Sequence, residues 1–349
     1  MRRAIASLLF VSVANVPASD NAQVEKTLLE QVRLRPTSFQ TNHNIGEFYI
    51  QQHQLAAAIP YLEKAWKIDP SNYNNAYDLA LASLQNGMPG KSREVITGLL
   101  RQKHHAELHN LLGDVEEAEG HVREAAEQYE TAVHMDPSEK HLFDLGSNLM
   151  LHRGFEPALK VFAFATARYP QSAKLRVGLG IAHYSLGQYD NAVESLCRAV
   201  DLDPKDTKAL DFLGKTYDIS PQFADEVTRR LAHFVQIYPD NAAASYYYAL
   251  SLRKRALSLA ADAPQAEVER LLVRAVKLDP GYADAYFELG LLYEDENQDS
   301  KAIRQYEIAI KLRSDLSKAH YRLGRLYQRN GQPAAAQKEF HAYEALKTK

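Results

Sequence analysis

The sequence predicts an all-α protein: a right-handed α-solenoid of about nine helix-turn-helix repeats, preceded by one N-terminal half-repeat helix. Three observations predict this fold. Prolines that end helices recur at a spacing of roughly 34 residues or its double. A Leu-Gly or Ile-Gly pair recurs in the same phase. Small and large apolar residues then follow each pair at fixed distances. A period of this length indicates stacked repeats rather than several globular domains.

Residues 1–18 are predicted to be a secretory signal peptide. Arg2 and Arg3 supply a positive start, residues 4–16 form an apolar run without charge, and Val16-Pro17-Ala18 has the small-residue ending of a cleavage site. The run is too short to span a bilayer, which takes about 20 residues. A frayed apolar N-terminus and an organellar transit peptide are the alternatives. Cleavage near Ser19 would make the protein an exported one, in a bacterial periplasm or secreted; without it the protein would be cytoplasmic.

Residues 19–38 are predicted to form a capping half-repeat. One helix is expected over roughly residues 23–35, because the segment then runs into Pro36. It would cover the N-terminal end of the repeat array, which is expected to occupy residues 39–349.

The repeat is first visible in the prolines that follow predicted helix ends. His104 and Ser314 occupy the same slot where the series has gaps. Proline cannot continue the hydrogen-bond ladder of a helix, so each proline marks the end of the second helix of a repeat. The series is Pro36, Pro70, Pro137, Pro170, Pro204, Pro239 and Pro280, and four of its members follow an aspartate.

Small and large residues recur in the same phase. The Leu-Gly or Ile-Gly pairs end at Gly46, Gly113, Gly146, Gly180, Gly214, Gly290 and Gly324. Alanines follow in the next predicted helix at Ala58, Ala125, Ala158, Ala192, Ala302 and Ala336. Large apolar residues stand shortly after them at Leu62, Tyr129, Phe162, Leu196, Tyr306 and Phe340. The small residues let helix backbones approach closely, and the large residue fills the gap between them.

This set of positions resembles the tetratricopeptide repeat. The resemblance implies a helix A, a tight turn and a helix B in each repeat. Glycines near the end of helix A, at positions 87, 120, 187 and 331, are expected to be left-handed caps. One helix pair cannot bury its own apolar face, so stacked neighbours supply the core. The resemblance covers about nine repeats, near residues 39–72, 73–105, 106–138, 139–172, 173–206, 207–241, 242–282, 283–316 and 317–349.

Two repeats depart from the pattern. The second repeat has Ala80 and Ser92 where glycine and alanine are usual, and it is expected to be less regular. The seventh repeat holds an insertion around residues 255–266, which is expected to lengthen the turn between its helices. A loop without function and a specialised contact are both open interpretations of the insertion.

Composition excludes several classes of function. The formal net charge is −3, so no overall field favours nucleic acid or an anionic membrane. No segment after the predicted signal peptide is apolar enough for stable membrane insertion. The single cysteine, Cys197, excludes an intrachain disulfide framework and a cysteine-rich metal site. Its place beside the large apolar slot of its repeat favours a small buried residue over a nucleophile.

The sequence has no motif that predicts catalysis or a cofactor. There is no glycine-rich phosphate loop, no G-x-S-x-G nucleophile turn and no paired-cysteine zinc spacing. His104, His105 and His109 are the strongest metal candidates, because His105 and His109 could share one helical face. No glutamate completes a metalloprotease arrangement, so a solvated loop and helix start is the favoured interpretation. We therefore expect no enzymatic activity, no cofactor and no metal.

Charge is concentrated in two repeats. Carboxylates crowd the third repeat, with Arg123 nearly their only counterion, and a solvated acidic face or a docking patch for a basic partner would each explain them. The helix A of the last repeat is basic, through Lys318, Arg322, Arg325 and Arg329, and the same two interpretations apply with the signs reversed. The acidic residues are Asp114, Glu116, Glu117, Glu119, Glu124, Glu127 and Glu130.

The resemblance also implies a binding surface. In this family the concave face is formed by helix A, mostly through its second, fifth, ninth and twelfth positions. Five of the nine fifth positions are aromatic here: Tyr77, Phe143, Tyr246, Phe287 and Tyr321. Together with Lys318, Arg322 and Arg325 they are the predicted protein-binding residues. Stacking of part of the series on neighbouring helices is the alternative interpretation.

Some family members grip a C-terminal carboxylate with a clamp of lysines and asparagines spread over three repeats. Lys318 and Arg322 match the third part of that clamp. Tyr246, Leu250 and Glu288 stand where its other residues would be required, which disfavours a chaperone-tail adaptor.

Two functions follow from this interpretation. The first is a non-enzymatic exported adaptor that binds protein or peptide segments on its concave face. The second is the partner-recognition subunit of an enzyme or assembly system, such as a glycosyltransferase, a protease, or a secretion or envelope-assembly complex, with catalysis in another chain. In both cases the partner is a protein or peptide and not a nucleic acid.

Overall fold

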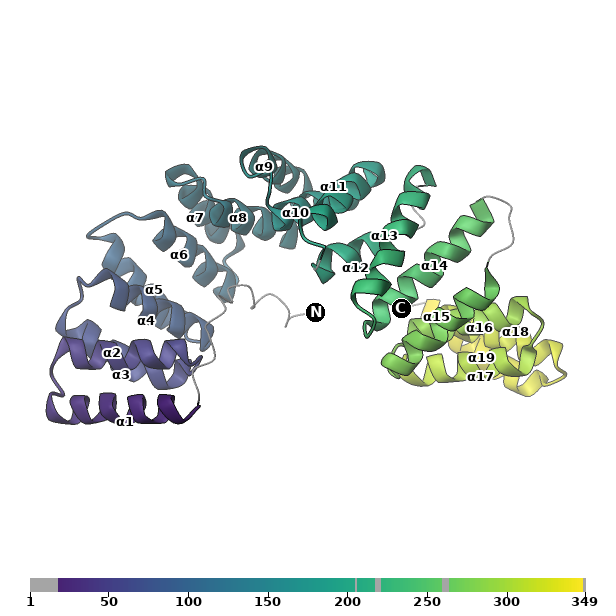
Figure 1. The fold of residues 1–349 in the computed structure, drawn as a ribbon, viewed down its shortest axis with the longest axis horizontal. Helices are drawn as coiled ribbons and strands as arrows, with labels where there is room; N and C mark the ends of the chain where they lie inside the picture. Colours follow the sequence, from purple (N-terminus) through teal and green to yellow (C-terminus); the bar gives the residue numbers. More distant parts are fainter. Residues whose placement is uncertain (1–17, 205, 217–220, 259–263, 348–349) are drawn as a thin grey trace. The chain divides into compact units, whose positions relative to one another are not determined.

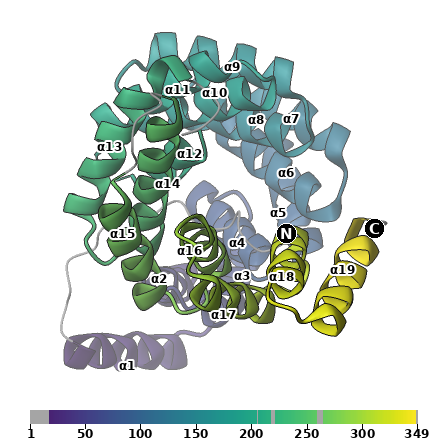
Figure 2. The same cartoon turned by 90° about the vertical axis from the view of Figure 1, so that its right-hand side faces the viewer.

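The computed structural model describes residues 18–204, 206–216, 221–258 and 264–347. Within these ranges the chain forms nineteen α-helices, which follow one another in packed pairs (Figures 1 and 2). The predicted all-α repeat fold is confirmed. Contacts divide the chain into two compact units, residues 1–165 and residues 166–349.

The N-terminal unit holds the first half-repeat helix and the pairs of repeats one to four. Each pair begins at the first residue of a predicted repeat. Its helices are α1 (Ala18–Leu34), α2 (Phe39–Gln51), α3 (Leu55–Ile68), α4 (Tyr73–Gln85), α5 (Pro89–Leu100), α6 (Ala106–Glu119), α7 (Val122–Met135), α8 (Glu139–Leu151) and α9 (Phe155–Arg168), the last of which contains the division between the units.

The C-terminal unit holds repeats five to nine. It also contains a short 3-10 helix, η1 (Pro221–Phe223). Its α-helices are α10 (Ala173–Ser185), α11 (Tyr189–Leu202), α12 (Thr207–Lys215), α13 (Ala224–Ile237), α14 (Ala242–Ser258), α15 (Gln265–Leu278), α16 (Ala283–Asp295), α17 (Asp299–Leu312), α18 (Ser317–Arg329) and α19 (Pro333–Lys347).

The A helices of neighbouring repeats contact one another in each unit. In the N-terminal unit α2 meets α4, α4 meets α6 and α6 meets α8; in the C-terminal unit α10 meets α12 and α12 meets α14. Each B helix described in these contacts packs on its own A helix or on the next one, as for α3 with α4 and α17 with α18. The A helices of a unit therefore share one side of it, which Figure 2 shows for α12, α14 and α16.

Short polar side chains begin many of the A helices. Asn72 Oδ1 accepts a hydrogen bond from the Asn75 amide at 3.1 Å, and Asn241 Oδ1 accepts one from Ala244 at 3.0 Å. Such caps satisfy amide groups that have no partner inside the helix. Ser138, Ser172 and Asp206 occupy the same place before their helices.

Turns and ends of the helices follow the predicted residues. Positive φ angles at Gly87, Gly120, Gly187 and Gly331 confirm the predicted left-handed caps between helices A and B. His53, Arg153 and Asn297 adopt the same conformation in repeats that lack the glycine. The predicted Asp-Pro endings are also confirmed, because α3, α7, α11 and α15 each end one residue before the aspartate.

The in-phase glycines lie where helices A and B approach most closely. A methyl group built on Gly146 would lie 2.6 Å from Phe162 Cζ, and one on Gly180 would lie 2.8 Å from Leu196 Cγ. The same opposition recurs in repeats one, three, eight and nine, with Leu62, Tyr129, Tyr306 and Phe340 as the large residues. Glycine is required because the partner ring or branch occupies the space of a side chain.

The sixth repeat departs further from the repeat pattern than the second. In the second repeat α4 and α5 are continuous, and Ala80 and Ser92 are fully buried. In the sixth, α12 ends at Lys215 and η1 precedes α13. Gly214 there faces Tyr247 of α14, in the following repeat, instead of a residue of its own helix B. The expected irregularity of the second repeat is limited to a shorter helix B, since α5 has 12 residues against 14 in α3 and α7.

The insertion of the seventh repeat is partly helical. It was expected to lengthen the turn, but α14 runs over 17 residues to Ser258, against 13 in α16 and α18. The remaining part, residues 259–263, lies outside the described residues.

At the N-terminus, α1 begins at Ala18, five residues before the expected start. Two contacts with α2 hold this extended helix: Asn21 Nδ2 donates to Gln52 Oε1 at 3.0 Å, just after α2, and Tyr49 Oη donates to Glu25 Oε1 at 2.8 Å. Residues 1–17, which hold the apolar run of the predicted signal peptide, lie outside the described residues.

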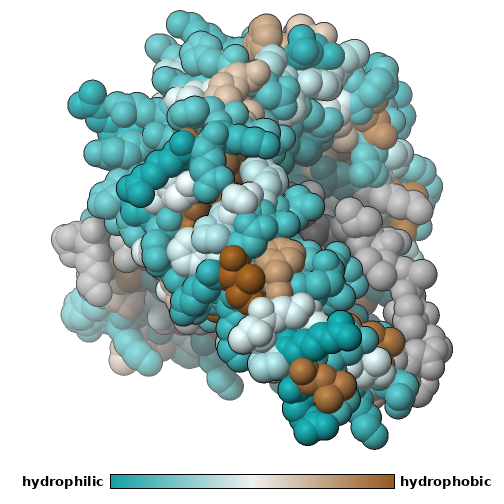
Figure 3. All heavy atoms as spheres, turned by 90° about the vertical axis from the view of Figure 1, so that its left-hand side faces the viewer, coloured by the Kyte–Doolittle hydropathy of each residue, from teal (hydrophilic) through white to brown (hydrophobic). Residues whose placement is uncertain are grey.

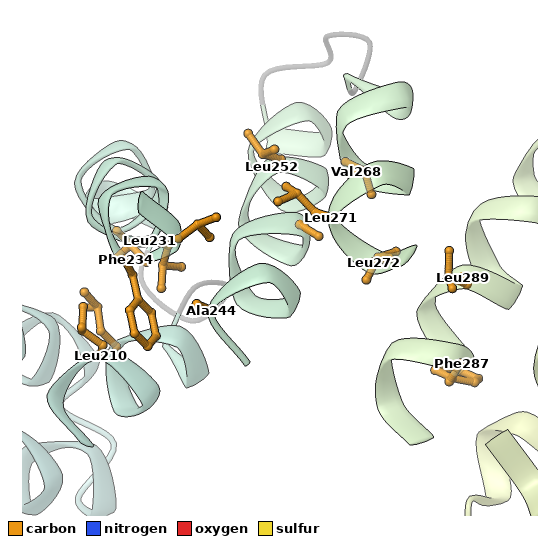
Figure 4. Packing of buried hydrophobic residues seen from close by; sticks show 14 of the residues in the cluster. Leu210, Leu231, Phe234, Ala244, Leu252, Val268, Leu271, Leu272, Phe287 and Leu289 are labelled. Carbon is orange, nitrogen blue, oxygen red and sulfur yellow. The ribbon is translucent and has the colours of Figure 1, made fainter. Parts of the chain in front are cut away.

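The core of each unit is built between neighbouring pairs. Figure 4 shows Leu210, Phe234 and Leu271 among the buried side chains that α12 to α16 contribute to the C-terminal unit. The face of the molecule drawn in Figure 3 is mainly hydrophilic, with hydrophobic residues in small separate groups. Within the described ranges, no helix has both the length and the apolar character needed to cross a bilayer.

Candidate functional site

The five predicted aromatic residues lie on helices A, but their exposure differs. Tyr321 of α18 is 41% exposed, whereas Tyr77 of α4, Phe143 of α8 and Tyr246 of α14 are half-buried. Phe287 of α16 is 9% exposed and belongs to the core of the C-terminal unit. The ring of Phe287 is therefore not the free contact residue that the sequence suggested.

Three of these rings pack on the large residue of their own repeat, whether they are exposed or buried. The fifth position of helix A lies one turn before the repeat glycine, so its ring reaches the large residue that faces the glycine. Phe143 contacts Phe162 with ring centroids 6.3 Å apart, Phe287 contacts Tyr306 at 5.6 Å, and Tyr321 contacts Phe340 at 6.2 Å. Part of the aromatic series thus stacks on neighbouring helices, the alternative that the sequence left open.

Tyr246 belongs to a group of three tyrosines. Its ring centroid lies 4.9 Å from that of Tyr282 and 5.4 Å from that of Tyr247. Burial, together with the charges of Asp211 and Asp284, raises the pKa of Tyr247 to about 12. Tyr282 precedes α16 and Tyr247 replaces a core residue of another repeat, so neither was visible as a site residue in the repeat pattern.

The basic residues of α18 surround Tyr321. Lys318 and Arg325 are exposed, whereas Arg322 is half-buried and its Nη1 donates to Glu294 Oε1 at 3.4 Å. Arg325 and Glu294 line an open depression of about 280 Å³ together with Leu326, Gln328 and Arg329. Helix α18 therefore presents an exposed ring between two exposed cations, next to a hollow formed with α16. The four predicted residues of α18 lie close together: Lys318, Tyr321, Arg322 and Arg325.

Tyr77 lies among carboxylates in the N-terminal unit. Burial raises the pKa of Tyr77 to about 12, and the charges of Asp114, Glu107, Asp78 and Asp144 raise it as well. These acidic residues come from α4, α6 and α8. We call Tyr77, Asp78, Glu107, Asp114 and Asp144 the Tyr77 cluster. Only Tyr77 and the acidic character of repeat three were predicted from the sequence.

Asp114 and Asp144 form the centre of this cluster. Asp114 Oδ1 accepts from Tyr129 Oη at 2.7 Å. Asp144 Oδ2 accepts from Lys140 Nζ at 2.7 Å and from Asn110 Nδ2 at 2.9 Å. The pKa of Asp114 is raised to about 6. Burial is the main cause and the charge of Asp144 adds to it, whereas the hydrogen bond from Tyr129 lowers the pKa.

The ionisation of Asp114 is expected to reduce stability. Because its pKa is raised in the folded state, folding favours the protonated form, and the ionised form becomes costly as pH rises from about 4 through about 6. Asp114→Asn should therefore raise the free energy of unfolding at pH 7.5 by about 1 kcal/mol. This value is smaller than the free energy that corresponds to the whole pKa shift, because solvent screens a half-buried side chain. Urea unfolding at pH 7.5 and pH 4 measures this, and the difference should shrink at the lower pH.

Glu124→Gln is the matched control, because Glu124 is exposed on α7 and carries the same charge. It should change stability by less than about 0.5 kcal/mol at either pH. A destabilised Asp114→Asn variant at pH 7.5 would contradict the assignment of a strained carboxylate.

The other carboxylates of repeat three have a different counterion from the expected one. Arg123 pairs with Glu127, whereas Arg93 of α5 bonds to both Glu116 and Glu119, with Nη2 2.8 Å from Glu116 Oε2. The sequence missed Arg93 because it stands in the preceding repeat. Possible ligand atoms of Glu116, Glu119 and His121 lie within 4.8 Å of one another. The guanidinium of Arg93 already supplies a positive charge there, so this group is an ion-pair network.

Of the three histidines considered as metal ligands, His104 and His109 contact each other, whereas His105 has another partner. His105 packs on Tyr73 with ring centroids 5.0 Å apart. His109 Nδ1 lies 2.8 Å from Gln128 Oε1, and its ring stacks on that of His104. His105 and His109 do not share the helical face that their spacing suggested. Cys197 is buried, and burial raises the pKa of its thiol to about 11.

Comparisons with known proteins identify the repeat. Two family models described as tetratricopeptide repeat match the chain, one over residues 49–115 and the other over residues 143–207 and 265–317. None of the curated proteins matches the sequence.

Solved structures share the fold. The C-terminal part of a TPR repeat-containing protein from Cytophaga hutchinsonii is 15% identical with a TM-score of 0.51, covering 80% of this chain and 99% of that one. MamA is 26% identical with a TM-score of 0.40, covering 50% and 92%. YrrB, described as a TPR protein with an unusual peptide-binding site, is 20% identical with a TM-score of 0.42, covering 53% and 97%.

Proposed function

Because this chain belongs to the tetratricopeptide-repeat family and is a protein-interaction scaffold, we propose that it holds a protein or peptide segment on its A helices and catalyses no reaction itself. One observation carries the proposal: α18 presents Tyr321, 41% exposed, between the exposed cations Lys318 and Arg325. Exposed aromatic and arginine side chains dominate the binding energy of protein interfaces.

The two kinds of side chain have different roles. Tyr321 rests on Tyr343 of α19, with ring centroids 5.2 Å apart, and on Phe340, so its position is largely fixed before a partner binds. It supplies the anchor. Lys318 and Arg325 lie at the rim, where charge speeds association more than it lengthens the life of the complex.

Affinity capture with the full chain tests the proposal. We expect a specific protein partner that binds saturably, and its identity decides whether the chain serves an enzyme or assembly system as its recognition subunit. Recovery of nucleic acid or a small molecule alone, with no protein partner, would refute the proposal.

We also propose that the protein is exported. The positive start, the apolar run and Val16-Pro17-Ala18 support cleavage before Ser19. N-terminal sequencing of the native protein from fractionated cells measures this directly. A mature chain that begins near Ser19 is expected; an intact N-terminus in the cytoplasmic fraction would contradict export.

A further inference from the structure

Negative charge in the N-terminal unit is concentrated on its A helices. Lys140 is the one lysine or arginine of α2, α4, α6 and α8. The B helices α3, α5 and α7 carry the two signs in equal number, five acidic and five basic residues. The acidic residues of the four A helices are Glu47, Asp78, Glu107, Asp114, Glu116, Glu117, Glu119, Glu139 and Asp144. This side of the unit therefore attracts cations.

Some of these charges already have partners within the chain. Arg93 bonds to Glu116 and Glu119, and Glu117 Oε2 accepts from Asn148 Nδ2 at 2.8 Å and lies 2.8 Å from His152 Nε2. The Tyr77 cluster differs, because Lys140 is the cation bonded within it. The charges of four carboxylates from three helices thus act on Tyr77, and one lysine, Lys140, bonds to one of them.

A buried amide inside the cluster also lacks a partner. Asn110 is 1% exposed and its Nδ2 donates to Asp144. In the part of the chain that the structure describes, its Oδ1 accepts no hydrogen bond. A buried acceptor without a donor is uncommon and costly. The cluster therefore has unused acceptor capacity as well as unbalanced negative charge, and both call for a positively charged donor.

Carboxylates of the A helices in the C-terminal unit have other counterions than those of the Tyr77 cluster. There carboxylates of α16 meet arginines of the same chain: Asp284 Oδ2 with Arg313 at 2.8 Å, and Glu288 Oε2 with Arg253 at 2.7 Å. Glu294 likewise meets Arg322. In the N-terminal unit Arg93 of α5 has this role, but its partners Glu116 and Glu119 do not belong to the Tyr77 cluster.

Tyr77 adds an aromatic surface to the charge. Its ring is half-buried and stacks on Tyr73, with centroids 5.9 Å apart and planes 17° from parallel. A guanidinium over a tyrosine ring gains from the ring quadrupole when it lies within about 6 Å. Carboxylates beside the ring bind the same guanidinium through paired hydrogen bonds. Tyrosine and aspartate together select arginine over an uncharged side chain of similar size.

We propose that the Tyr77 cluster binds an arginine of a basic segment in the partner protein, with Asp114 and Asp144 as its acceptors and Tyr77 as its stacking surface. This inference rests on the proposed function and names the chemistry of the partner for the N-terminal unit. The occupant is a segment of another protein, because one arginine in an extended basic chain fits a cluster spread over α4, α6 and α8.

A labelled peptide of alternating arginine and glycine tests this with the full chain. Fluorescence anisotropy should show binding that weakens from about 50 mM to about 300 mM salt. The same peptide with citrulline in place of arginine, which keeps the shape and removes the charge, should bind at least about tenfold more weakly. Equal binding of the two peptides overturns the proposal.

Matched variants locate the site. Asp114→Asn with Asp144→Asn removes two charges from the cluster and should weaken the arginine peptide about tenfold or more. Glu124→Gln with Glu130→Gln removes two exposed charges from α7 and should weaken it less than about twofold. Circular dichroism must show that both pairs keep the helical fold. Equal losses in the two pairs overturn the proposal.

Two further outcomes separate this inference from the proposed function. A captured partner that loses affinity with Tyr321→Ala but not with Asp114→Asn and Asp144→Asn overturns the inference and leaves the proposed function standing. Salt-sensitive dimers in analytical ultracentrifugation that the Asp114 and Asp144 variants abolish would make a second copy of the chain the occupant, which also overturns it.

Discussion

Gly146→Ala is expected to lower the free energy of unfolding by about 1–3 kcal/mol, although alanine is the better helix former. The added methyl group would lie 2.6 Å from Phe162 Cζ and 2.8 Å from its Cε1. Phe162 is fully buried, so its ring has little room to move and α8 and α9 are forced apart. Urea unfolding followed by circular dichroism measures the change.

Gly98→Ala is the matched control. Gly98 lies inside α5 of the same unit, and no atom lies within 4 Å of an added methyl group. The same substitution should therefore stabilise the protein by up to about 1 kcal/mol, through helix propensity alone. Opposite signs for two glycine-to-alanine changes distinguish close packing from propensity. A stabilised Gly146→Ala variant would contradict the close approach of α8 and α9.

The second repeat suggests a further substitution that should offset the destabilisation caused by Gly146→Ala. It has Ala80 in the glycine position and Ile96 in the position of Phe162, and both are fully buried. Gly146→Ala combined with Phe162→Ile should thus cost less than the sum of the two single changes, by at least about 0.5 kcal/mol. Hydrogen exchange in the single variant should rise first around α8 and α9 and fade with distance, since each repeat contacts only its neighbours.

Tyr321→Ala is expected to weaken the captured partner about thirtyfold, the equivalent of about 2 kcal/mol. The ring is the exposed anchor of α18, so its removal should act mainly on the dissociation rate. Tyr189→Ala is the control, because Tyr189 is also 41% exposed but lies at the start of the B helix α11. It should change affinity less than about twofold. Surface plasmon resonance measures both rates.

Charge reversal at the rim should act differently. Arg325→Glu is expected to slow association at low salt, with a smaller effect on dissociation. Both variants must keep the helical circular dichroism signal. If Tyr321→Ala and Tyr189→Ala bind the partner equally well, α18 is not the binding surface.

The fold could be predicted from the sequence, because the repeat spacing shows directly which residues of helices A and B approach each other closely. Gly146 and Phe162 could be paired from phase alone, and the Asp-Pro endings gave the ends of α3, α7, α11 and α15. The irregular sixth repeat was not predicted. Its Gly214 faces Tyr247 of the next repeat in place of a residue of its own helix B, and no local sequence pattern indicates that replacement.

The candidate site could be predicted only in part. Tyr321 and its neighbouring cations lie on one helix, so helical spacing was enough to group them. The Tyr77 cluster and the pairing of Arg93 with Glu116 join residues of different repeats, whose side-chain directions are set by stacking. Phe287 and Tyr321 share one repeat position, and each ring packs on the large residue of its own helix B. Their exposed fractions, 9% and 41%, differ all the same, and no local pattern in the sequence predicts that difference.

Hydrogen exchange of the full chain, with and without its captured partner, tests the central claim most directly. The account predicts that added protection concentrates in the A helices, above all α18 and the A helices of the Tyr77 cluster, α4, α6 and α8. The B helices α3, α5, α7, α15 and α17 should change little. Protection confined to the B helices, with α18 and α4 unchanged, would contradict the claim that this protein holds its partner on the A helices.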